Sequence, residues 1–136
     1  MNRQEIQTKL GLVTSQLLCA KGYISYPDLF IALGYLDQRD YENWRFRRVP
    51  YLERVIKTNL GRISFIMTTV KKNSLHGKLK PSWTAYLSWG KGSKGQLRFS
   101  TSGSPPIEQL WATHFVKPRP GQAEPAGAGD APPARD

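Results

Sequence analysis

The sequence predicts a mainly α-helical domain that ends in a β-hairpin, which is a mixed α+β fold. Apolar residues recur at helical spacing over most of residues 3–74, whereas apolar and polar residues alternate over 83–89. At 136 residues, the chain has the length of one domain. We expect residues 1–117 to form this single compact domain. Residues 118–136 are rich in Pro, Ala and Gly and are expected to be a disordered tail.

The first two helices are predicted from their apolar faces and their end signals. Residues 3–20 form the first helix, which should end near Gly22. The second helix begins at Ser25, with Pro27 in its first turn, and ends at Gly34. The apolar faces consist of Ile6, Leu10, Val13 and Leu17 in the first helix and Leu29, Phe30 and Leu33 in the second.

Two or three further helical segments are expected before residue 75, depending on whether residues 59–61 kink the chain or separate two helices. Asp37 begins one that continues through Trp44, and Pro50 begins another. Asn59 and Gly61 mark this kink or break, and a last helical run follows. The residues expected to face inward are Leu52, Val55 and Ile56 after Pro50, and Ile63, Ile66, Met67 and Val70 in the last run. The spacing of the second and third helices is compatible with a helix-turn-helix motif.

The hairpin is predicted over residues 83–100, with the turn at 90–95. The first strand would have an apolar face made of Trp83, Ala85, Leu87 and Trp89, with Tyr86 on the opposite face as a candidate for base stacking. A basic hairpin after a helical bundle is the order found in winged-helix domains, where the hairpin lies along the nucleic-acid backbone. We therefore expect a winged-helix-like fold. The core would be closed by a short helix or third strand containing Ile107, Leu110, Trp111, Phe115 and Val116.

Positive charge is concentrated in one part of the chain. The formal net charge is +10, and residues 45–98 contain thirteen Lys or Arg against a single acid, Glu53. This interval carries thirteen minus one, or +12, so the rest of the chain is close to neutral. Unpaired cations must stay in water because burial of a charge is costly. The folded chain should therefore present a dense positive surface that suits a polyanion.

Three arginines within four positions, Arg45, Arg47 and Arg48, form the sharpest part of this surface. The arginine guanidinium can donate two hydrogen bonds at once to a phosphate or a guanine edge, which lysine does not do, and this favours contact with nucleic acid. Alternatively, one or two of them pair with Glu42 and Glu53 and the rest are solvated. The basic stripe continues through Arg54, Lys57 and Arg62.

The turn over residues 90–95 formally matches the spacing G-x-G-x-x-G. A dinucleotide site needs this motif to lead from a strand into a helix, whereas residues 96–100 predict a strand. Two interpretations stay open. The turn is either a flexible hairpin tip, or a wing in which Lys91, Lys94 and the following Arg98 contact phosphates. The intervening lysines 71, 72, 78 and 80 are interpreted as solvated.

Several classes of protein are disfavoured by the composition. One cysteine, Cys19, cannot form an intramolecular disulfide, and with only two histidines a structural zinc site is not expected. Neither a membrane-spanning run nor a signal peptide is recognised, so we expect a cytoplasmic protein without a membrane partner. No acid pair, Cys-His pair or Ser-His-Asp set indicates catalysis, and no cofactor or metal is expected.

Several segments resemble a family of small, uncharacterised bacterial proteins. They are residues 40–45, 49–56, 79–84, 89–92, 97–100 and 112–115, and the resemblance covers about residues 20–117. It implies a bacterial source and a self-contained domain. Because the family has no known activity, the resemblance transfers no functional residue.

The function expected from these observations is nucleic-acid binding, with duplex DNA favoured over RNA because of the possible helix-turn-helix order. The contact residues would be Arg45, Arg47, Arg48, Arg54, Lys57, Arg62, Lys91, Lys94 and Arg98. The alternative is a protein-interaction module, such as an adaptor or inhibitor, whose basic face docks an acidic partner. An enzyme is the third and least favoured interpretation.

Overall fold

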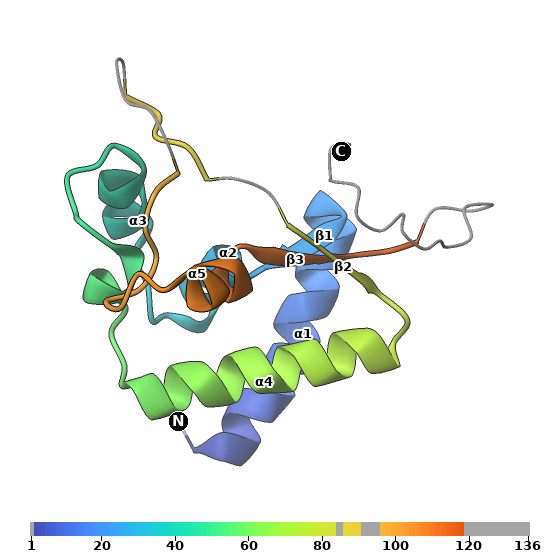
Figure 1. The fold of residues 1–136 in the computed structure, drawn as a ribbon. Coiled ribbons are helices and arrows are strands. Elements are labelled where there is room, and N and C mark those ends of the chain that lie inside the picture. Colours follow the sequence, from blue (N-terminus) through green and yellow to red (C-terminus); the bar gives the residue numbers. More distant parts are fainter. Residues whose placement is uncertain (1, 84–85, 91–95, 119–136) are drawn as a thin grey trace.

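The computed structural model describes residues 2–83, 86–90 and 96–118, and Figure 1 shows the arrangement of their helices and strands. The described residues are mainly helical and include a small antiparallel sheet, which confirms the α+β class. In chain order the elements are α1 (Arg3–Lys21), β1 (Tyr23–Ser25), α2 (Tyr26–Leu33), α3 (Gln38–Arg45), the 3₁₀ turn η1 (Leu52–Val55), α4 (Leu60–His76), β2 (Lys80–Trp83), α5 (Pro105–Trp111) and β3 (Thr113–Val116).

The helix boundaries follow local capping signals, as predicted. Gly22 and Gly34 end α1 and α2 in the left-handed conformation, at φ 85° and 88°, which costs glycine little. The Ser25 side chain accepts a hydrogen bond from the backbone N–H of Asp28 at the start of α2. The Asn59 side chain caps α4 in the same way. The predicted ends at Gly22 and Gly34 and the predicted start at Ser25 are confirmed. Asp37 precedes α3 as predicted but makes no side-chain capping bond.

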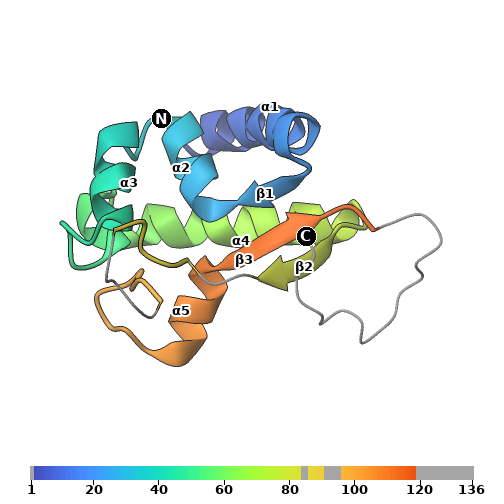
Figure 2. The same ribbon diagram turned by 90° about the horizontal axis from the view of Figure 1, so that it is seen from above.

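The sheet has the strand order β1-β3-β2, so the last strand in the sequence lies at its centre. Figure 2 shows β3 between the other two strands, with α4 passing behind them in that view. Ile24 and Pro81 pair with Phe115 on one face, and Ser25 and Ser82 pair with His114 on the other. Because Ile24 and Phe115 are buried, the first of these two faces packs on the core.

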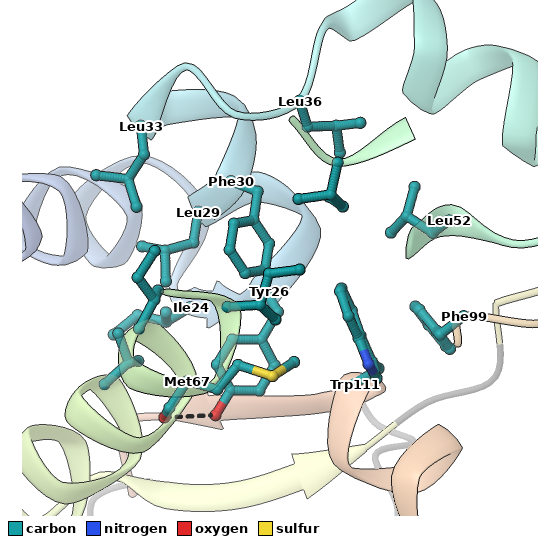
Figure 3. Packing of buried hydrophobic residues seen from close by; sticks show 14 of the residues in the cluster. Ile24, Tyr26, Leu29, Phe30, Leu33, Leu36, Leu52, Met67, Phe99 and Trp111 are labelled. Carbon is teal, nitrogen blue, oxygen red and sulfur yellow. Dashed lines mark hydrogen bonds between the residues drawn. The ribbon is translucent and has the colours of Figure 1, made fainter. Parts of the chain in front are cut away.

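Aromatic rings connect the helices to the chain that follows β2. Phe99 packs on Trp44 of α3 and on Trp111 of α5, with ring centroids 5.0 and 5.8 Å apart, and all three rings are buried. Figure 3 shows Trp111 and Phe30 within the same core, where the Tyr26 hydroxyl donates to the backbone oxygen of Met67 at 3.3 Å. Such aromatic contacts contribute about 0.5–1.5 kcal/mol each beyond the burial of area.

The strand pairing differs from the predicted hairpin. β2 begins at Lys80 and pairs with β3, whereas the described part of 86–100 contains only an isolated bridge between Leu87 and Gln96. The predicted alternation is also inverted. Tyr86 is 6% exposed, whereas Leu87 and Trp89 are 52% and 49% exposed. The reason is tertiary, because Tyr86 packs against the buried rings of α3 and the 96–100 segment.

Two smaller differences have similar causes. The helix predicted after Pro50 is only the 3₁₀ turn η1, since the N–H of Glu53 donates to Phe99 O at 2.8 Å and that of Lys57 to Tyr35 O at 2.7 Å. These backbone donors have partners outside any local helix. The core is closed by both α5 and β3, although Ile107 and Leu110 of α5 are exposed.

Candidate nucleic-acid interface

Half of the cations of this protein lie on a long stretch of chain that contains no acid. Between Glu53 and Glu108 the sequence has ten Lys or Arg residues and neither Asp nor Glu. The two flanking carboxylates bond to the backbone. Glu108 accepts hydrogen bonds from the N–H groups of Phe99 and Ser100 at 2.6 and 2.8 Å, and Glu53 accepts one from the Thr101 N–H at 2.8 Å. Both acids therefore hold the 99–101 segment in place.

Arg45 is built into the fold. Its guanidinium carbon lies 5.9, 5.1 and 4.7 Å from the ring centroids of Tyr41, Tyr86 and Trp89. The guanidinium donates to the Tyr41 hydroxyl at 3.1 Å and to the backbone oxygen of Leu87 at 2.9 Å, and its buried Nε has no hydrogen-bond partner among the described residues. Burial raises the pKa of the Tyr41 hydroxyl, against the opposing effect of this guanidinium. Arg45 thus connects α3 to residues 86–90.

Arg47 and Arg48 follow α3 and are exposed. The backbone turns here, because Arg47 has φ 61° and the N–H of Arg48 donates to Asn43 O at 2.8 Å. The Arg48 guanidinium donates to the Asn43 side chain at 3.1 Å and lies 5.0 Å from the centroid of the Phe46 ring. We call residues 45–48 the arginine turn. It presents two guanidinium groups to solvent and keeps a third inside.

The other predicted contact residues lie in different surroundings. Arg54 is exposed on η1, and Arg62 is half-buried in the first turn of α4, with Nη1 3.5 Å from the Tyr35 hydroxyl. Lys57 forms an ion pair with Asp37 at 2.6 Å, and this hydrogen bond raises the pKa of the Lys57 ammonium. Arg98 donates to the carbonyls of Ser100 and Thr101 and packs on Tyr51. Lys91 and Lys94 lie outside the described residues.

Two exposed lysines, Lys71 and Lys72, lie in the C-terminal half of α4, where the sequence predicts solvated side chains. We call the exposed side of this helix the outer face of α4, and it consists of Gly61, Ser64, Thr68, Lys71, Lys72 and Leu75. The opposite side is buried through Ile63, Ile66, Met67 and Val70. The helix contains no acid. Figure 1 shows α4 in the lower half of the view, crossing α1, whereas α3 lies in the upper half. The 3.6-residue period of a helix could have identified this face from the sequence.

His114 occupies a polar cluster next to the rings around Arg45. Its Nε2 lies 2.8 Å from the Tyr86 hydroxyl, and its ring stacks on Tyr23 with centroids 4.8 Å apart. Burial lowers the pKa of His114 to about 4, although Asp28 opposes this shift. A neutral imidazole can accept a hydrogen bond from the Tyr86 hydroxyl at Nε2. No local sequence signal links these two residues, because they are distant in the chain.

The chain matches no protein-family model, and neither a curated protein nor a solved structure is significantly similar to it. Among residues 2–83, 86–90 and 96–118, no helix combines the length and the apolar character needed to cross a membrane. Within the same ranges, no group of three or more His, Cys, Asp or Glu residues could hold a metal ion. Function must therefore be argued from charge and exposed side chains.

Proposed function

We propose that the protein binds nucleic acid, with duplex DNA as the preferred form. The observation that carries the proposal is the acid-free interval between Glu53 and Glu108, which contains ten cations. The two carboxylates that flank it in sequence both accept hydrogen bonds from the backbone. A surface on which cations outnumber the nearby carboxylates attracts a polyanion and releases the counterions of that polyanion on binding.

The arginine turn and the outer face of α4 would supply the contacts. Arg47, Arg48 and Arg54 are exposed and suited to phosphates, with Lys57 and Arg62 at the margin. Arg45 and Arg98 already bond within the fold, so they would act chiefly by positioning the surface. Lys91 and Lys94 would add charge from the 90–95 turn. A nucleic-acid partner also fits a cytoplasmic location.

The order of elements supports a winged-helix-like arrangement. β2 follows α4 and pairs antiparallel with β3, with α5 between the two strands in the sequence. This pair replaces the 83–100 hairpin as the candidate wing pair. α2 and α3 are separated by residues 34–37, a turn length typical of helix-turn-helix motifs. α4 directly precedes β2, and the major groove of B-form DNA is wide enough to admit an α-helix.

Fluorescence anisotropy with duplex DNA, single-stranded DNA and RNA over a salt series tests the proposal. If six to eight cations meet phosphates of a duplex, log K should fall with log salt at a slope of about −5 to −7. The double variant Arg47→Ala, Arg48→Ala should bind duplex DNA at least tenfold more weakly. The matched control Arg3→Ala, Lys9→Ala removes two exposed cations of α1 and should bind like wild type.

Two results would contradict the proposal. Failure to bind any of the three nucleic acids at about 50–100 mM salt, where phosphate contacts dominate, would leave an acidic protein as the remaining partner class. Equal weakening by the control pair would show that net charge, and not the arginine turn, sets the affinity. A purified sample with a high 260/280 nm absorbance ratio that a high-salt wash lowers would favour nucleic acid.

A further inference from the structure

We propose that Trp89 and Phe46 form a stacking site for an unpaired base of a nucleic-acid strand that continues from a bound duplex. The inference rests on the proposed function and adds a substrate class to it, which is a duplex with a single-stranded extension. It begins from two large rings that the fold leaves in water.

Trp89 and Phe46 are 49% and 40% exposed and contact each other. Their ring centroids are 5.7 Å apart with an interplanar angle of 78°, although the residues belong to segments far apart in the sequence. Single exposed apolar side chains are common on protein surfaces, whereas contacting aromatic rings at a basic surface are typical of sites that bind single strands. The two rings contact each other in a T-shaped arrangement and are both partly open to solvent.

Contacts within the fold order both rings before any ligand binds. The N–H of Trp89 donates to the backbone oxygen of Arg45 at 2.9 Å, and the Arg45 guanidinium lies 4.7 Å from the centroid of the Trp89 ring. The edge of Tyr41 also contacts Trp89, at a centroid distance of 5.9 Å. The Phe46 ring lies against the Arg48 guanidinium. An ordered ring loses little conformational entropy when a base stacks on it.

The charges around the rings select the ligand class. Arg47 and Arg48 adjoin Phe46 in sequence and are exposed, so they supply positive charge close to the ring for the phosphates of a stacked nucleotide. Bases inside a duplex stack on one another and do not present their faces to a protein ring. An unpaired extension presents both a base face and a phosphate, and therefore fits rings and arginines together.

The test compares one blunt duplex with the same duplex carrying a four-thymidine overhang, by anisotropy at one salt concentration. We expect the overhang to raise affinity about five- to a hundredfold, the range for one stacked base. An overhang of four abasic nucleotides keeps the phosphates and should lose most of this gain. Trp89→Ala and Phe46→Ala should each remove most of it, and Trp89→Ala should still bind the blunt duplex like wild type.

Leu87→Ala is the matched control, because Leu87 is exposed on the same segment and lies outside the ring pair. It should retain the full gain. An abasic overhang that binds as tightly as thymidine, or a gain that survives in both Trp89→Ala and Phe46→Ala, overturns the stacking site and leaves the proposed function intact. Absence of binding to the blunt duplex overturns the proposed function, and the stacking site with it.

Discussion

The arginine turn and the outer face of α4 carry the same sign of charge in different surroundings. At the turn, Arg45 lies among three aromatic rings and bonds to the Leu87 carbonyl, so part of its charge interacts with the fold. On α4, Lys71 and Lys72 extend from the exposed side of a helix with a buried apolar face. The comparison teaches that a run of cations can include both structural and ligand-facing side chains.

The two regions should therefore respond differently to mutation. Removal of a cation from the turn is expected to change folding stability, since rings and backbone carbonyls lose a partner. Removal of a cation from the outer face of α4 is expected to change only the binding of a polyanion. Four changes examine this difference, from the largest expected effect to the smallest.

A fall in pH should destabilise the surroundings of the arginine turn more than α4, because His114 becomes protonated. The pKa of His114 is lowered to about 4 by burial, so its full contribution to stability is present above the unfolded value of about 6.5 and is lost progressively as pH falls from there to about 4. At about 1.4 kcal/mol per pKa unit, the loss approaches about 3 kcal/mol. Because the Tyr86 ring contacts both His114 and Arg45, protonation should also loosen residues 86–90.

Urea unfolding at pH 7 and pH 4.5 measures this loss, and His114→Gln supplies the control. The glutamine cannot be protonated, so the variant should lose markedly less stability over this range than wild type. Lys21, Tyr23 and Asp28 also face the cluster, and Asp28 forms an ion pair with Lys21 at 3.0 Å. An identical pH dependence in both proteins would assign the acid response to these groups.

The substitution Arg45→Ala should lower the free energy of unfolding by about 2 kcal/mol. It removes two hydrogen bonds at about 1 kcal/mol each, together with the cation–π contacts to three rings, and it relieves the unpaired buried Nε. Arg45→Lys keeps the charge but not the forked geometry, so it should be nearly as destabilising. Equal stability of wild type and both variants in urea would show that the contacts around Arg45 are energetically neutral.

The sequence could predict elements whose signals are local. Gly22, Ser25, Gly34 and Asn59 mark the boundaries of α1, α2 and α4, and apolar periodicity identifies their buried faces. The pairing of β2 could not be predicted in this way, because its partner, β3, follows thirty residues later. The alternation of side chains along residues 83–89 defines two faces of a strand, but it could not specify which face packs on the core.

The candidate site also has features that the sequence predicts and features that depend on residues far apart in the chain. Composition predicts a basic surface, and exposure places Arg47, Arg48 and Arg54 on it. The inward position of Arg45 depends on Tyr86 and Trp89, which lie more than forty residues along the chain. No pattern of charge spacing contains that information. The sequence therefore predicts how much charge reaches the surface better than it predicts which cations bind a ligand.

The double variant Lys71→Ala, Lys72→Ala should reduce affinity for duplex DNA at least tenfold and leave stability unchanged. If both lysines meet phosphates, the slope of log K against log salt should become shallower by about 1.8, since each contact adds about 0.9. Ser15→Ala and Gln16→Ala on α1 are exposed controls that keep the charge. An unchanged slope would exclude the outer face of α4 from the interface.

The smallest effect is expected when Lys57, at the margin of the arginine turn, loses its ion-pair partner. Asp37 forms an ion pair with Lys57 at 2.6 Å, and Asp37→Asn removes the carboxylate charge. The Asp37 side chain makes no capping hydrogen bond at the start of α3, so the substitution should leave this helix intact. Lys57 would then be available to a phosphate, and affinity should rise about two- to fivefold, with a steeper salt dependence. Lys57→Ala should abolish this gain when the two changes are combined. A gain that persists in the double variant would arise from the general loss of a negative charge and would place Lys57 outside the interface.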